Sequence, residues 1–314
     1  MAQLTETQAR LDRIVVGANP LTGVDHFLGE RARERSIRLT DEAIRQTLNT
    51  AFHSGATGFT FNVGEPTRLL LGTLLPPPRD AEVGLYGLVP DSEFVSNVIN
   101  QGTSSAITTL LRDTGAIAHA AALLKGGWAA LTNDVGLALM TYISAEASRL
   151  RRVTPRGFRL RSILLHELVT DALLSLRLSS VLSSFIKGTR ELDLIPGLVT
   201  RNFSALIRFC DATRVPLDRV LIMAPFNPIG FQMTPNRESC EEALRNLQGP
   251  RVMAISLLAG GRVSLDEGIA YLQRLAGISS VAVGVSTPGH AAQTFARLGG
   301  LASGWTDNAT RVRT

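Results

Sequence analysis

The feature that most constrains this chain is a series of short runs of small and β-branched apolar residues, each ending at a glycine or a polar residue. Two runs near the end of the chain, residues 251–261 and 280–287, have almost no polar interruption. Such runs are typical of strands buried on both faces, as in a parallel sheet. A helical pattern follows each run, so the sequence predicts alternating strands and helices.

The same unit recurs along the whole chain. The predicted strands are residues 14–17, 58–62, 83–89, 158–165, 194–199, 219–224, 251–261 and 280–287. Parallel strands that alternate with helices indicate the α/β class. Eight units favour a closed (β/α)8 TIM barrel, with a doubly wound open sheet as the alternative. The length of 314 residues suits one barrel, so we expect a single domain over residues 1–314.

The interval between the third and fourth predicted strands is far longer than an ordinary connection. Its pattern is helical, so we expect a helical insertion over residues 101–157. Long segments beside an active face are often lids, which favours a cover over the mouth of the barrel. A contact between copies in a homo-oligomer, through residues 104–150, is the alternative.

Composition excludes several classes of protein. The net charge is +5, but the basic residues are scattered among acidic ones, and nucleic-acid binding normally needs a basic stripe. No apolar run reaches the roughly 20 residues that span a bilayer. Two lone cysteines, Cys210 and Cys240, suit buried positions in a reducing compartment. We therefore expect a cytoplasmic protein that binds neither nucleic acid nor membrane.

Polar residues that follow barrel strands converge on one end, where barrels of this class keep their active sites. His166 directly follows the fourth predicted strand and can act as acid, base or hydrogen-bond donor, although a structural half-buried histidine is the alternative. His26, in a polar loop, is a second candidate acid or base, with an exposed loop histidine as the alternative. Together with Tyr86 of the third strand, they are the candidate catalytic residues.

The loops after the last two strands indicate an anion site. Gly260 and Gly261 allow close approach of the backbone, and the segment from Gly284 to Gly289 leads into a helix N-terminus. Simple tightness of these loops is the alternative. Spacings typical of metal ligands are absent, so no metal is expected. Neither lysine, Lys125 or Lys187, lies on a predicted strand, which disfavours Schiff-base chemistry.

Read in order, the strand ends resemble the aldo-keto reductases, a superfamily of (β/α)8 barrels that reduce carbonyl groups with NADP. His166 is similar to that family's histidine after the fourth strand, and Asn202 to the asparagine of its fifth-strand S-N-F motif. The stretches that carry the resemblance are residues 55–62 with 65–72, 164–166, 199–203, 224–227, 256–261 and 283–286.

The sequence departs from the family at its catalytic residues. Thr60 stands where the family has an Asp. No Tyr lies between Asn62 and Glu65, and no Lys follows the third strand, so only His166 of the usual four remains. The usual proton donor to a carbonyl oxygen is therefore missing.

The resemblance implies NADP as cofactor and a set of residues that would hold it: Asn202, Asn227, Ser256, Gly260, Gly261, Ser286 and Thr287. Two other features of the family's cofactor site are missing. No Arg follows Ser286 and Thr287 to hold a 2′-phosphate, and residues 256–261 contain no aromatic to stack on nicotinamide.

Two functions remain open from the sequence. The first is an enzyme that acts on a small polar carbonyl metabolite, most specifically an aldo-keto reductase-like oxidoreductase, with a non-redox lyase or isomerase as a variant. The second is a non-catalytic barrel that binds a protein partner.

Overall fold

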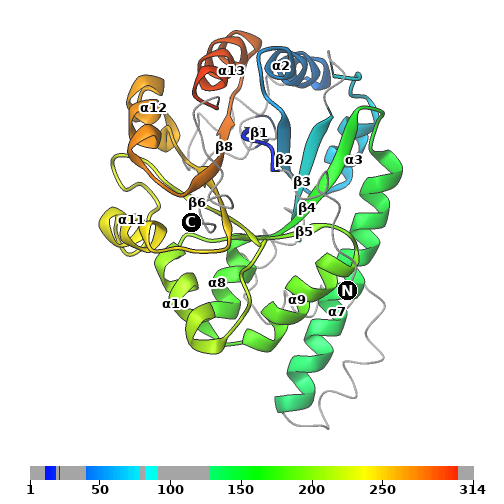
Figure 1. Ribbon diagram of the computed structural model, residues 1–314. Helices are drawn as coiled ribbons and strands as arrows, with labels where there is room; N and C mark the ends of the chain where they lie inside the picture. Colours follow the sequence, from blue (N-terminus) through cyan, green and yellow to red (C-terminus); the bar gives the residue numbers. More distant parts are fainter. Residues whose placement is uncertain (1–10, 19–20, 22–39, 78–81, 91–127, 303–314) are drawn as a thin grey trace, which may run out of the picture.

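A computed structural model describes residues 11–18, 21, 40–77, 82–90 and 128–302 (Figure 1). The predicted His26 lies outside this part of the chain, and so does most of the interval before residue 128. Within the described residues, no helix is long and apolar enough to cross a membrane.

The strands form one closed parallel barrel, as the sequence predicts. They are β1 (Ile14–Gly17), β2 (Gly58–Asn62), β3 (Val83–Val89), β4 (Phe158–Leu165), β5 (Ile195–Val199), β6 (Leu221–Pro225), β7 (Arg251–Ile255) and β8 (Ile278–Gly284). Each strand pairs with its neighbours in chain order, and β8 closes on β1 with Ala282 opposite Val15. The open-sheet alternative is excluded.

Helices surround the barrel in Figure 1. They are α2 (Asp41–His53), α3 (Glu65–Gly72), α7 (Trp128–Val153), α8 (Glu167–Ser175), α9 (Ser179–Glu191), α10 (Phe203–Thr213), α11 (Arg237–Arg245), α12 (Leu265–Arg274) and α13 (Pro288–Ala302). Local chemistry accounts for several starts: Thr40 caps α2, and Ser264 with Glu267 forms a capping box on α12.

The segment between β4 and β5 contains two helices, α8 and α9. The first, α8, begins at Glu167, because the His166 side chain caps it. Arg177 takes a left-handed conformation, with φ of 56°, in the turn before α9. A left-handed residue cannot continue a right-handed helix, so the chain turns and starts again.

The core has two parts. Inside the barrel, side chains from seven of its strands pack on one another, among them Val15, Leu164, Met223 and Met253. A larger layer lies between the outside of the barrel and the helices, and includes Phe59, Phe61 and Phe185. The barrel interior is therefore filled, and polar side chains can reach solvent only at its two ends.

The helix α7 occupies the second half of the predicted insertion. It lies along α9 and also contacts α3 and β4, which places it in the ring of helices around the barrel (Figure 1). The remainder of the predicted insertion, residues 101–127, lies outside the described residues, so the role of this segment as lid or oligomer contact stays a prediction.

Candidate functional site

His166 lies between the end of β4 and the start of α8, at the carboxyl end of the barrel strands. Its backbone N–H donates to the Val89 carbonyl at 2.7 Å, which ties it to the end of β3. Its side-chain Nδ1 accepts from the Leu168 N–H at 3.3 Å. An accepting ring nitrogen carries no proton, so the neutral imidazole has its proton on Nε2. The ring is thus oriented as a donor through Nε2.

The charge state of His166 follows from its surroundings. Burial lowers the pKa of the imidazole below its usual value; Glu167 opposes this shift and Arg201 adds to it. The ring is therefore neutral near pH 7, because the charged form is penalised at this position. A neutral imidazole with a fixed N–H suits donation to a substrate oxygen.

Five residues that follow β4 and β5 are linked to one another by hydrogen bonds and an ion pair. We call them and His166 together the mouth cluster: His166, Glu167, Asp171, Thr200, Arg201 and Asn202. Glu167 forms an ion pair with Arg201 across the ends of β4 and β5. The Arg201 Nε is buried and has no hydrogen-bond partner among the described residues. The cluster therefore retains an unused donor at the mouth.

Asp171 organises the end of β5. Its carboxylate accepts from the Thr200 hydroxyl, from the Arg201 N–H at 3.3 Å, and from the Asn202 side chain. Burial nevertheless raises the pKa of this carboxyl above its usual value. The sequence prediction placed Asn202 at the mouth as a cofactor ligand. The structure places it after β5, at the same end of the barrel as His166, and its side chain is hydrogen-bonded to Asp171.

The loops after β6 and β7 hold each other in place. Asn227 is fully buried; its side chain donates to the Phe231 carbonyl and accepts from the Phe231 N–H, both at 2.8 Å. The Ser256 hydroxyl donates to the Gln232 side chain at 3.2 Å. Both predicted ligands thus have internal partners. Ser256 and Gln232 also have left-handed backbones, with φ of 53° and 60°, a strain that often marks functional loops.

The remaining predicted ligands lie in turns with accessible backbone. Gly260 and Gly261, in the short helix η1 (Ala259–Gly261), have φ of 69° and 88°, and no atom lies within 4 Å of where a Gly261 Cβ would stand. Thr287 accepts the His290 N–H at 3.2 Å and so caps α13, with Ser286 immediately before it. The N-terminus of α13 and the open backbone at Gly261 each suit an anionic group.

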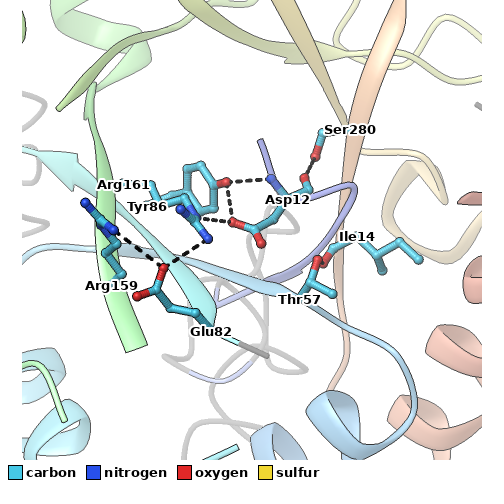
Figure 2. A network of polar contacts seen from close by, with 8 residues as sticks. All are labelled: Asp12, Ile14, Thr57, Glu82, Tyr86, Arg159, Arg161 and Ser280. Carbon is cyan, nitrogen blue, oxygen red and sulfur yellow. Dashed lines mark hydrogen bonds and ion pairs between the residues drawn. The ribbon is translucent and has the colours of Figure 1, made fainter. Parts of the chain in front are cut away.

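Tyr86, the third predicted catalytic residue, points toward the amino end of the barrel, opposite to the mouth cluster. It is fully buried within the barrel, and its hydroxyl donates to the Asp12 carboxylate at 2.7 Å and accepts the Asp12 N–H at 2.9 Å (Figure 2). Asp12 precedes β1, so this contact lies at the amino end of the barrel. Tyr86 also lies three residues before Val89, about 10 Å along the strand. The structure does not bring it together with His166.

A buried ion pair completes this contact. The Arg161 Nε donates to Asp12 Oδ2 at 3.0 Å, and its Nη2 lies 3.3 Å from Glu82 (Figure 2). Ser280 of β8 donates to the Asp12 carbonyl at 2.6 Å. We call Asp12, Glu82, Tyr86, Arg161 and Ser280 the floor network. The sequence signal for this network is a pair of arginines at alternate positions of β4, Arg159 and Arg161. The sequence analysis did not identify it.

Burial shapes the ionisation of the floor network. It raises the pKa of the Asp12 carboxyl, although Arg161 and Tyr86 oppose the shift. Burial and the neighbouring Asp12 raise the pKa of the Tyr86 phenol well above its usual value. Tyr86 is therefore a neutral donor at any ordinary pH. No group of three or more His, Cys, Asp or Glu side chains suited to a metal occurs in the described ranges.

The fold and the mouth cluster define a (β/α)8 barrel with a polar site at the carboxyl ends of its strands. No protein-family model matches the chain, and no curated protein matches it in sequence. Solved structures do match over nearly its whole length. A candidate aldo-keto reductase from Pseudomonas aeruginosa is 17% identical, with a TM-score of 0.56 and coverage of 96% of this chain and 94% of that one.

A second match is the aldo-keto reductase AKR11C1 from Bacillus halodurans in its holo form, 12% identical, with a TM-score of 0.54 and coverage of 94% and 87%. A variant of the Gox0644 protein in complex with NADPH is 14% identical, with a TM-score of 0.50 and coverage of 95% and 86%. At these identities the likeness concerns the fold. The chain therefore has the barrel fold seen in aldo-keto reductases.

Proposed function

We propose that this protein is an oxidoreductase that reduces the carbonyl group of a small polar metabolite with NADPH. The observation that carries the proposal is the placement of His166. Its ring is fixed by the Leu168 N–H, is neutral near pH 7, and holds its proton on Nε2 at the carboxyl end of the barrel. The fold is that of aldo-keto reductases, and one structural neighbour binds NADPH.

The residues fit the cofactor best at its phosphate end. Gly261 offers open backbone, and Thr287 with the first turn of α13 offers a helix N-terminus. NADPH supplies a hydride when bound. At the other end, Asn202 and Asn227 already make internal hydrogen bonds, although an amide can form more than the bonds seen here. We assign these two residues to orientation of the site rather than to strong binding.

In this proposal, His166 replaces the missing tyrosine. Its Nε2–H donates a hydrogen bond to the substrate carbonyl oxygen and then passes the proton to the oxygen as the alkoxide forms. The imidazolate that this transfer leaves takes a proton back from water. Arg201, held by Glu167, adds positive charge beside the ring and favours release of that proton. Thr60, at the position of the family's Asp, is buried, and its hydroxyl has no partner within the described part of the chain.

The test is NADPH oxidation with a panel of small polar aldehydes and ketones. Loss of a positioned acid typically costs about 10²–10⁴ in rate, so His166→Gln and His166→Ala should lose that much while the fold persists. His53→Gln is the matched control, because His53 is an exposed residue at the end of α2. His26→Ala tests the second candidate acid. Full activity in His166→Ala would contradict the proposed role.

Cofactor binding is tested separately by calorimetry. Binding of NADPH that survives both Gly261→Asp and Ser286→Asp would mean that the phosphate site lies elsewhere. Absence of NADPH binding would favour the second candidate function, a barrel without redox chemistry. The internal hydrogen bonds of Asn227 and Ser256 are the observation in favour of that alternative, because they use polar groups that a cofactor would otherwise meet.

A further inference from the structure

A groove runs between α10 and α11 on the outside of the barrel. It encloses about 710 Å³, within the usual range for sites that bind small molecules. Its walls follow from helical spacing, since residues three or four apart share a face. Ser204 on α10 and Ser239 and Ala243 on α11 are small, so the two helices leave space between them.

The groove has an apolar side. Val215 and Leu217, which follow α10, are buried and line it, together with the partly buried Leu247 after α11. Ile207 of α10 adds a fourth aliphatic side chain. Such a surface suits a chain of methylene groups, which gains free energy by leaving water.

The charged side chains of the groove are mostly acidic. Asp211, Asp218 and Glu242 line it, against a single guanidinium from Arg208. Asp218 lies 3.8 Å from Arg219, whereas no ion pair of the described residues involves Asp211 or Glu242. Two carboxylates, one from each helix, are thus available to a cation.

The backbone adds to this negative potential at one end. Residues 213 and 245 end α10 and α11, and the groove continues beyond both, past Asp218 and Gly249. The carbonyl end of a helix carries a partial negative charge that favours cations. Two such ends meet at the same end of the groove, so a cationic group is favoured there independently of the carboxylates.

A buried polar atom lies at the opposite end. Ser204, near the start of α10, lines the groove and is only 1% exposed. Its hydroxyl has no hydrogen-bond partner among the residues that the structure describes. An unpaired buried hydroxyl is costly, and such groups normally have a partner. A ligand with N–H donors would supply one.

We propose that this groove binds a linear aliphatic polyamine. Its ammonium groups would lie beside Asp211, Glu242 and the two helix ends, and its methylene groups along Val215 and Leu217. The helix α10 has 11 residues and is about 16 Å long, which suits an extended chain with several amines. This site is separate from the proposed oxidoreductase site and does not depend on it.

The test is calorimetric titration of the full-length protein with spermidine, and with putrescine as the shorter diamine, at physiological salt. We expect saturable binding, stronger for spermidine because it can meet both carboxylates and the helix ends. The double variant Asp211→Asn, Glu242→Gln should weaken spermidine binding at least about tenfold, since two charge-assisted hydrogen bonds are lost. Ser204→Val should weaken it about tenfold, because the hydrogen bond between a charged ammonium group and the hydroxyl is lost.

The matched control is Asp41→Asn, Glu65→Gln, which removes the same charge from the exposed starts of α2 and α3. It should bind spermidine as the unmodified protein does. Thermal unfolding of every variant checks that the fold persists. Equal loss in the control would mean nonspecific attraction and would overturn the proposal. So would the absence of spermidine binding, or binding of a lysine-rich peptide in place of spermidine.

Discussion

Polar side chains at the two ends of this barrel differ in burial and in hydrogen bonding. At the amino end, the floor network is buried: Asp12 and Arg161 are 8% and 7% exposed, and Asp12 has partners in Tyr86 and Arg161. At the carboxyl end, Arg201 is 40% exposed and its Nε has no partner within the described residues. In barrels of this class the amino end serves stability and the carboxyl end function, and here the difference lies in hydrogen bonding.

A polar side chain inside the barrel therefore does not by itself indicate a functional site. A buried network whose groups are paired fixes the strands that contribute to it, here β3, β4 and β8. A cluster at the rim, with donors left over, can exchange its internal contacts for contacts with a ligand. Variants at the two ends of the barrel should therefore differ in their effects on stability and on turnover.

Replacing Arg161 by Met should cost about 3–5 kcal/mol of unfolding free energy, because Asp12 would remain buried without its cation. Urea unfolding measures this. Arg159→Met is the control: Arg159 is 37% exposed and lies 3.9 Å from Glu82, so its loss should cost less than about 1 kcal/mol. Similar losses in both variants would mean that burial of the pair does not decide its contribution.

Tyr86→Phe should lower the unfolding free energy by about 1–3 kcal/mol, because the Asp12 carboxylate and N–H both lose a buried partner. Any turnover should persist, since the hydroxyl lies at the amino end. Tyr271→Phe, which removes a less buried contact to Glu241, is the control for a phenol deletion. Loss of turnover with unchanged stability would mean that Tyr86 is a catalytic residue and that the amino end of the barrel also serves function.

Glu167→Gln should change the unfolding free energy by no more than about 1 kcal/mol, because its partner Arg201 is partly exposed and water screens the pair. The same change should free Arg201 and alter the pH dependence of any turnover through His166, whose pKa Glu167 holds up. Urea unfolding and pH–rate profiles measure the two effects. A stability loss as large as that of Arg161→Met would make the mouth cluster structural.

The smallest effect expected is on the pH dependence of stability. The pKa of His166 is lower in the folded chain than its usual value of 6.5, so the unfolded chain binds the proton first on acidification. The His166 contribution to stability is therefore complete above that value and falls as the pH drops below it. Thermal melts from pH 7 to pH 5 should show a shallower decline in His166→Gln. An identical decline would mean that the imidazole is not buried as described.

Most of the fold could be predicted from the sequence. Eight apolar runs with helical patterns between them led to a closed parallel barrel, and that is the fold. The break between α8 and α9 could not be predicted, because it depends on a left-handed Arg177, a residue type with no preference for that conformation. The starts of α2 and α12 depend on the capping residues Thr40 and Ser264, which act locally.

The candidate site was predicted less completely. Position after a strand was enough to place His166 at the mouth, since parallel strands end together. The partners of Asp171 and Arg201 were missed, because they connect α8 to the end of β5 and depend on how far each side chain reaches. The same limit applied to Tyr86: the pattern placed it on a barrel strand but not its hydroxyl at the amino end.

The class of fold, and the end of the barrel where polar residues gather, could be inferred from the chain alone, because strand and helix periodicity are local properties. Which polar groups are already hydrogen-bonded depends on the folded molecule. Asp12 and Arg161 are 149 residues apart, and Asp12 and Ser280 are 268 apart, yet each pair shares a hydrogen bond. Contacts over such separations arise from closure of the barrel, which brings together strand ends that no local pattern relates.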